Sequence, residues 1–319
     1  MDPRLNPAGA AAPADAGRLL PIDRVVVVWN VLLCAAWLAA AGRESSAAVW
    51  AILHAAAAWL LPAWLRGGGR RRGGMAGALR DAYPWLVWVV AWSELGRLHA
   101  VSQAATRDPL IARLDLALFG GPLHRTWALA ASGRWLQEAA HFAYLSYFVL
   151  IVVVPLRAVL RQRRDEFRAA TLGMVATYLG CFAVSAALPV CGPRLAEGAG
   201  AGHGLFASLA AALRAAGDSP GTAFPSSHCA ASVMSACLAW RAGSRRLAPW
   251  LAGWAAAVVL STVYTGNHYA LDAAAGAAWA LLLNAALGPR RALAPRRRTI
   301  AGRRATAIAG GERAWPSRS

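Results

Sequence analysis

Long runs of apolar residues, separated by short segments rich in arginine, recur along most of the chain. A helix needs ~20 predominantly apolar residues to cross a bilayer, and most of these runs approach that length. The pattern therefore predicts an all-α integral membrane protein with about eight transmembrane helices. The expected spans are 25–41, 47–65, 82–98, 139–156, 169–188, 227–240, 247–263 and 270–287.

Charge first suggests a different class of protein. The 319 residues carry a net charge of +18, and all 33 basic residues are arginine, which could indicate binding to nucleic acid. The arginines, however, crowd alternate loops between the apolar runs, as in 66–80, 157–168 and 241–246. Loops of this kind face the cytoplasm. We therefore expect a cell membrane protein with no nucleic-acid partner and with both termini in the cytoplasm.

Three polar clusters fall on the opposite, extracytoplasmic side. The first, 189–194, ends the fifth span; the second, 224–228, begins the sixth; the third, 265–272, joins the seventh and eighth. His228 and His268 are 40 residues apart, which is the length of one helix across the bilayer and another back. Both histidines should therefore return to the same face at similar depth.

The residue types in these clusters suit phosphoryl-ester chemistry. Ser226 and Ser227 begin a helix after Pro225, and the free N–H groups of a helix N-terminus bind phosphate. Arg194 adds a planar guanidinium fork for phosphate oxygens. His268 and Asp272 lie four residues apart at the start of a helix, so the carboxylate can orient the imidazole. We expect His268 to be the nucleophile and His228 the acid that protonates the leaving oxygen.

Each motif alone is weak, because a Pro-Ser-x-His string also describes an ordinary helix cap. The interpretation as a phosphoryl-transfer site depends on all three clusters falling on the same side of the membrane. Asn267 and Tyr269 flank the proposed nucleophile and are further candidates for contact with substrate. Histidines near other spans could instead hold haem between helices, which we consider a minor alternative. A disulfide between Cys191 and Cys229, which flank the motifs, is conceivable but not expected.

The segments around the spans complete the expected organisation. In order, they are a disordered cytoplasmic tail at 1–20, two N-terminal transmembrane helices at 21–66, an Arg/Gly-rich cytoplasmic loop at 67–81, a catalytic transmembrane domain at 82–288 and a basic disordered cytoplasmic tail at 289–319. The half-apolar stretch 110–119 of the long loop 99–138 could lie in the membrane interface.

At these residues the chain resembles the type 2 phosphatidic acid phosphatase superfamily. That family carries an Arg-Pro first motif, then Pro-Ser-Gly-His, then Ser-Arg-x5-His-x3-Asp. Here the counterparts are Pro193-Arg194, Pro225–His228, and Ser261-Thr262 followed by His268 and Asp272. The resemblance implies a six-helix phosphatase-type core, a phosphohistidine at His268, and neither metal nor other cofactor. Thr262 departs from the pattern, because most members have arginine there.

That departure resembles the inositolphosphotransferase branch, which includes inositol phosphorylceramide synthases. The resemblance implies a lipid phosphatase or phosphotransferase acting on a phospholipid or prenyl-phosphate type of substrate, with inositol-phosphate transfer as one form of the reaction. A non-enzymatic lipid-phosphate carrier or transporter using the same pocket is the alternative. The sequence separates neither hydrolysis from transfer nor one oligomeric state from another.

Overall fold

The computed structural model describes residues 19–67, 74–102, 105–130, 132–196 and 204–288. Most of these residues are helical, and an isolated parallel bridge between Val190 and Thr222 is the one β pairing within those ranges. The prediction of an all-α protein is therefore confirmed. The expected tails, apart from residues 19 and 20, and the arginine run at 70–72 lie outside the described residues.

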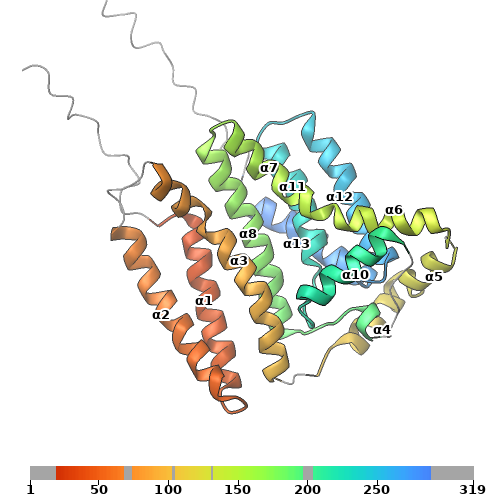
Figure 1. Ribbon diagram of the computed structural model, residues 1–319, viewed down its shortest axis with the longest axis horizontal. Coiled ribbons are helices and arrows are strands. Elements are labelled where there is room, and N and C mark those ends of the chain that lie inside the picture. Colours follow the sequence, from red (N-terminus) through yellow and green to blue (C-terminus); the bar gives the residue numbers. More distant parts are fainter. Residues whose placement is uncertain (1–18, 68–73, 103–104, 131, 197–203, 289–319) are drawn as a thin grey trace, which may run out of the picture.

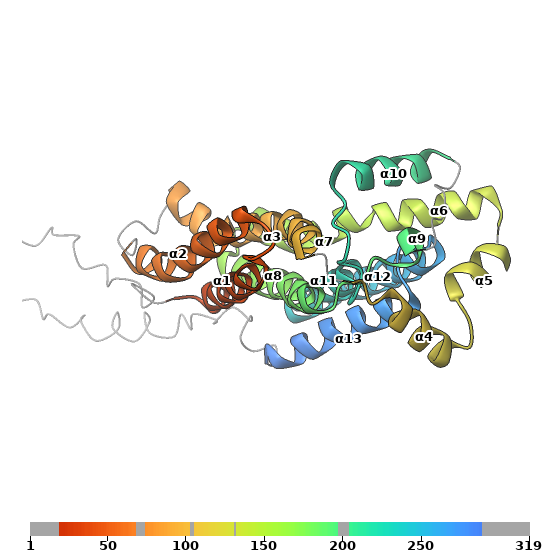
Figure 2. The same ribbon diagram turned by 90° about the horizontal axis from the view of Figure 1, so that it is seen from below.

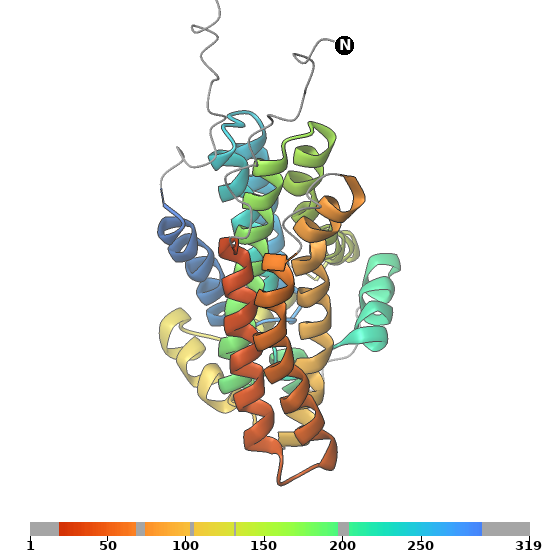
Figure 3. The same ribbon diagram turned by 90° about the vertical axis from the view of Figure 1, so that its left-hand side faces the viewer.

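The helices surround a central group formed by α8, α11 and α12. Figures 1 and 2 show α1 and α2 on one side of this group, and α4, α5, α6 and α10 on the other. The two N-terminal helices run side by side along the edge (Figure 3). In chain order the helices are α1 (Pro21–Ala40), α2 (Ser45–Gly67), α3 (Gly74–Ser102), α4 (Asp108–Phe119), α5 (Leu123–Ala130), α6 (Arg134–Leu145), α7 (Tyr147–Leu160), α8 (Arg164–Ala187), α9 (Pro193–Ala196), α10 (Leu205–Gly217), α11 (Ser227–Arg241), α12 (Leu247–Tyr264) and α13 (Ala270–Ala286).

Membrane character is supported by five long apolar segments among the described residues. They are Pro21–Ala40, Ser46–Arg66, Arg134–Leu160, Arg164–Ala187 and Leu247–Tyr264. These segments coincide with the first, second, fourth, fifth and seventh expected spans. Helices α11 and α13 have only 15 and 17 residues, and α3 carries charged side chains. The count of eight spans and the six-helix core therefore stay predictions.

Helix α3 begins at Gly74, well before the expected start at residue 82. Its charged residues can be helical there because each has a partner on a neighbouring helix. Asp81 accepts hydrogen bonds from Arg164 at 2.5 Å and from Arg168 at 2.8 Å, and Arg80 pairs with Asp23. Paired charges cost less to bury than isolated ones, which lets the helix extend toward the arginine-rich end.

The fourth expected span is a helix interrupted by a turn. Helix α6 ends and α7 begins on either side of Ser146, whose hydroxyl accepts a hydrogen bond from the Trp254 indole at 2.6 Å. The segments expected as long loops also contain helices. The half-apolar stretch at 110–119 forms most of α4, which buries Ile111 and Asp115 while leaving Leu114 exposed.

Helix directions place the histidine-bearing turns and the arginine-rich loops at opposite ends. Helix α11 runs from Ser227 to Arg241, and α12 runs back from beside Arg246 to the turn before α13. Glycine at 276 lets α13 lie directly against the start of α11, because an added Cβ there would meet the Ser226 carbonyl oxygen at 2.2 Å. Two of the polar clusters are thereby held together.

Candidate active site

The start of α11 is fixed by backbone contacts and by its own cap. The Ser226 amide donates to the Asp272 carbonyl at 3.0 Å, which ties the second polar cluster to the third. The Ser226 hydroxyl accepts from the Cys229 amide at 3.3 Å, as an N-cap side chain does, and the residue is fully buried. Its hydroxyl is therefore used inside the helix start, whereas Ser227 lines the neighbouring cavity.

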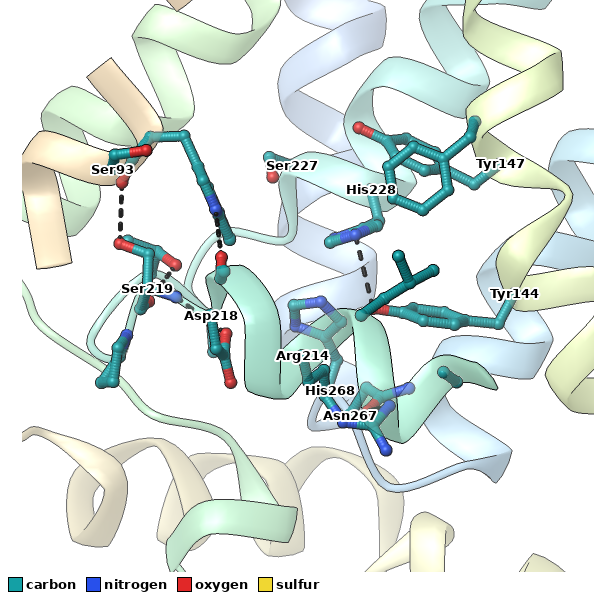
Figure 4. Close-up of a pocket in the computed structure, with 18 of the residues that line it drawn as sticks. Ser93, Tyr144, Tyr147, Arg214, Asp218, Ser219, Ser227, His228, Asn267 and His268 are labelled. Atoms are coloured by element: carbon teal, nitrogen blue, oxygen red, sulfur yellow. Dashed lines mark hydrogen bonds between the residues drawn. The ribbon is translucent and has the colours of Figure 1, made fainter. Parts of the chain in front are cut away.

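His228, in the first turn of α11, lies against two tyrosines that flank the break at Ser146. Its ring centroid is 5.3 Å from that of Tyr144 and 4.5 Å from that of Tyr147. The Tyr144 hydroxyl is 3.4 Å from His228 Nε2 (Figure 4). These contacts fix the plane of the imidazole before any substrate arrives.

His268 lies 5.7 Å from His228, measured between ring centroids, so the predicted convergence of the two histidines is confirmed. Its Nδ1 is 3.6 Å from Asp272 Oδ2, which is too long for a hydrogen bond but already directs Nδ1 toward the carboxylate. The same Oδ2 accepts from the Tyr269 amide at 2.9 Å. Burial lowers the pKa of His268 to about 4, so its imidazole is neutral near pH 7.

Arg194 is anchored to the turn that carries His268. Its amide donates to the Gly266 carbonyl at 3.0 Å, and its guanidinium donates to the Thr265 carbonyl. Gly192, two residues before Arg194, has φ +85°. It lies so close to the turn at Asn267 that an added Cβ would be 2.6 Å from the Asn267 carbonyl oxygen. Glycine is therefore required there, both for its backbone conformation and for the tight contact.

Two carboxylates of α4 hydrogen-bond to the backbone of the first and third polar clusters. Asp108 accepts from the amides of Cys191 and Gly192, both at 2.9 Å. Asp115 accepts from the Leu271 amide at 2.7 Å. Because the two aspartates are seven residues apart, they share one face of α4, and that single face holds the first and third clusters together. Both aspartates lie outside the three polar clusters, so the sequence alone did not indicate that they join separate motifs.

A cavity of about 620 Å³ is lined by five of the predicted residues and by several others. Its polar end is lined by Ser227, His228, Asn267 and His268 (Figure 4). Arg194 also lines the cavity. Asp272 lies fully buried behind His268, and Tyr269 packs with Ile111 and Val190 away from the cavity. The structure thus brings five predicted residues to the cavity, places Asp272 behind it, and leaves Ser226 and Tyr269 outside its lining.

A sequence model of the PAP2 superfamily matches residues 109–286, which is more than half of the chain. The chain belongs to the PAP2 superfamily. Comparisons with curated proteins and with solved structures gave no match. PAP2 proteins are typically phosphoesterases, so membership and the apolar helices together indicate a membrane protein with phosphatase-type activity on a lipid phosphate. The match begins within α4 and includes all three clusters; the inositolphosphotransferase branch stays a prediction.

This PAP2 site lacks a cation at the position where the family pattern has arginine. Thr262 is fully buried, donates to the Val259 carbonyl at 2.8 Å, and lies 3.3 Å from the Cys229 sulfur. It is not among the residues that line the cavity. Cys191 and Cys229 are both free cysteines, so no disulfide joins them.

Arg214 of α10 lines the cavity together with Asp218, and neither was among the predicted site residues. Its Nη1 donates to Asn267 Oδ1 at 3.4 Å. It lies outside the three motifs, in a stretch that the apolar pattern did not mark as a span. A basic residue near the end of an amphipathic segment was the available signal.

Proposed function

We propose that this PAP2 protein is an integral membrane lipid phosphatase or phosphotransferase that works through a histidine nucleophile. The observation that carries the proposal is the meeting of His228, His268 and Arg194 at one end of a single cavity. Two imidazoles and a guanidinium around one space can bind a phosphate, attack it and protonate the group that leaves.

A lipid substrate is supported by the other end of the same cavity. That end is apolar and aromatic, with Trp88, Trp92 and Val89 from α3, Phe148 from α7, and Tyr178 and Phe182 from α8. Val89 and Phe148 are 53% and 50% exposed on the outer surface of the helices, where the surrounding medium is lipid in a membrane protein. A phospholipid or prenyl-phosphate tail would lie between α3 and α7 while its phosphate reaches the histidines.

In the first step, His268 Nε2 attacks phosphorus while Asp272 holds Nδ1. A P–N bond forms, and the bond from phosphorus to the lipid oxygen breaks. His228 takes up a proton as the anionic phosphate binds beside it and gives this proton to that oxygen, so the lipid leaves as an alcohol. Arg194 and the N–H groups at the start of α11 bind the phosphate oxygens during the transfer.

In the second step, water or another hydroxyl attacks the phosphohistidine. His228, now neutral, takes the proton of the attacking group, and the P–N bond breaks to restore His268. Attack by water releases inorganic phosphate, whereas attack by an alcohol gives a new phosphate ester. The exchange balances without an external oxidant, reductant or other co-reactant.

Transfer to a hydroxyl-bearing acceptor, as in the inositolphosphotransferase branch, is a finer form of this proposal. Asp218, Ser219 and Thr222 also line the cavity and offer hydrogen-bonding groups for a polyol. A labelled phosphoinositide would separate the two outcomes. Release of free inositol phosphate or phosphate means hydrolysis, and a new labelled lipid means transfer.

Turnover by matched variants tests the proposal. Phosphate release from phosphatidic acid and from a prenyl phosphate would be measured with purified wild-type, His268→Ala and Asp272→Asn protein in detergent. Each variant should lose at least roughly 10³-fold in kcat, because the nucleophile or its orienting group is gone. Asp165→Asn, an exposed carboxylate at the arginine-rich end, is the control and should keep wild-type activity.

Both variants retaining kcat within about tenfold of wild type would overturn the mechanism. A wild-type protein that binds lipid phosphate, but neither releases nor transfers the phosphoryl group, would favour the carrier alternative. In that case the cavity would bind the phosphate headgroup without chemistry.

A further inference from the structure

Helix α10 lies against the polar end of the cavity, although it belongs to none of the three motifs. Ala210, Leu213, Arg214 and Gly217 of this helix all line the cavity. Figure 2 shows α10 beside α6, on the side of the molecule that holds α4 and α5. The helix thus forms part of the wall around any group bound between the histidines.

Both ends of α10 are fixed to other helices. At its start, the Glu138 carboxylate of α6 accepts from the amides of Phe206 at 3.0 Å and Ala207 at 3.3 Å. At its end, the Gly217 carbonyl accepts from the Trp92 indole of α3 at 2.9 Å. A carboxylate at a helix N-terminus also complements the helix dipole. These hydrogen bonds therefore fix the position of the residues near the end of α10.

Arg214, in the last turn of α10, is half-buried and lies beside Asn267 and His268 (Figure 4). Its Nη1 donates to the Asn267 side chain at 3.4 Å, which is a long hydrogen bond to a neutral group. Asp218, one turn further on, accepts from the Ser219 amide at 2.9 Å. The contact with Asn267 uses one donor of the guanidinium, and a bound anion can accept from the others.

Arg194 and Arg214 reach this cavity from different segments, α9 and α10. Burial and the nearby charge of Arg214 both lower the pKa of Arg194, so the two guanidinium groups repel each other. Two cations held together in a partly dry space gain most from a bound anion with two or more charged oxygens. Thr262 supplies no such charge, because it is buried against Cys229 and lies outside the cavity lining.

We propose that Arg214 is a second phosphate-binding residue, which clamps the substrate phosphate from α10 opposite Arg194 and beside His268. The inference rests on the proposed function for the identity of the anion, but not on turnover. The alternative is that Arg214 only fixes Asn267. That role would need one donor of the five on a guanidinium, and it would not make anion affinity depend on the charge at 214.

Direct binding of orthovanadate, a phosphate mimic, tests the inference without requiring turnover. Titration calorimetry on purified protein in detergent would compare wild type with Arg214→Gln, Arg214→Lys and Arg113→Gln. Arg113 is an exposed arginine of α4 and serves as the matched control. Loss of a charge-assisted contact should weaken binding about 10- to 100-fold in Arg214→Gln, with a smaller loss in Arg214→Lys.

Several results would overturn the inference. Wild-type affinity in Arg214→Gln would do so, as would an equal loss in Arg113→Gln or the absence of vanadate binding to wild type. Should Arg214→Gln fail to fold, Arg214→Lys decides: no binding by a folded Lys variant means that the charge at 214 does not hold the anion. A wild type that binds vanadate through Arg214 yet turns over no lipid phosphate would sink only the proposed function.

Discussion

At the scale of single residues, different contacts position the two histidines. The ring of His228 lies against Tyr144 and Tyr147, whereas His268 is 3.6 Å from the carboxylate that should orient it. Hydrogen bonds of this kind are often long before substrate binds and shorten in the reacting complex. Before substrate binds, the acid His228 is therefore already oriented, and the nucleophile His268 lies close to its working position.

Tyr144→Phe tests whether the tyrosine hydroxyl positions His228 for proton transfer. The contact is 3.4 Å long, so its loss should lower kcat only roughly two- to tenfold, with KM nearly unchanged. Tyr83→Phe makes the same change at the arginine-rich end, where the hydroxyl bonds Asp23 at 2.8 Å, and should leave kcat unchanged. Equal kcat values for Tyr144→Phe and wild type would remove Tyr144 from the mechanism.

Residue types and spacing were enough to predict much of the site. Five predicted residues line the cavity because their motifs start or join helices at one end of the bundle: Arg194, Ser227, His228, Asn267 and His268. The exact use of each side chain could not be predicted in this way. Ser226 sits next to Ser227, yet its hydroxyl caps α11, since adjacent residues at a helix start point in different directions.

At the scale of elements, the long apolar helices were predictable and the bracing helices were not. Helices α4 and α6 carry carboxylates that hold neighbouring segments in place, and α10 carries Arg214, which lines the cavity. Helices α4 and α10 have only 12 and 13 residues, too few to cross a bilayer, and α6 was expected only as part of a longer span. The polar contacts of these helices join segments far apart in the sequence. Asp115, for example, binds the Leu271 amide across 156 positions. Such pairings depend on tertiary packing, which a single sequence does not show.

At the scale of the whole molecule, the site and the arginine-rich loops lie at opposite ends of the bundle. We propose that the arginine-rich end faces the cytoplasm and that the site opens to the other side, as the positive-inside rule favours. Helices α1 and α2 precede the family match and have no assigned part in the chemistry.

Labelling of introduced cysteines in intact cells tests this orientation. Ser132→Cys is exposed before α6 at the site end, and Asp165→Cys is exposed at the start of α8 at the other end. A membrane-impermeant maleimide should label Ser132→Cys in intact cells, but Asp165→Cys only after the membrane is opened. Wild-type protein, with its own five cysteines, gives the background. The reverse pattern would place the site in the cytoplasm.

The central claim is a covalent phosphoryl group on His268. Protein turning over a radiolabelled lipid phosphate would be quenched rapidly in alkali, which preserves phosphohistidine, and its peptides would then be mapped. The account predicts label on the peptide that contains His268, loss of that label in acid, and no label in His268→Ala. Label on another residue, or undiminished labelling of His268→Ala, would contradict it.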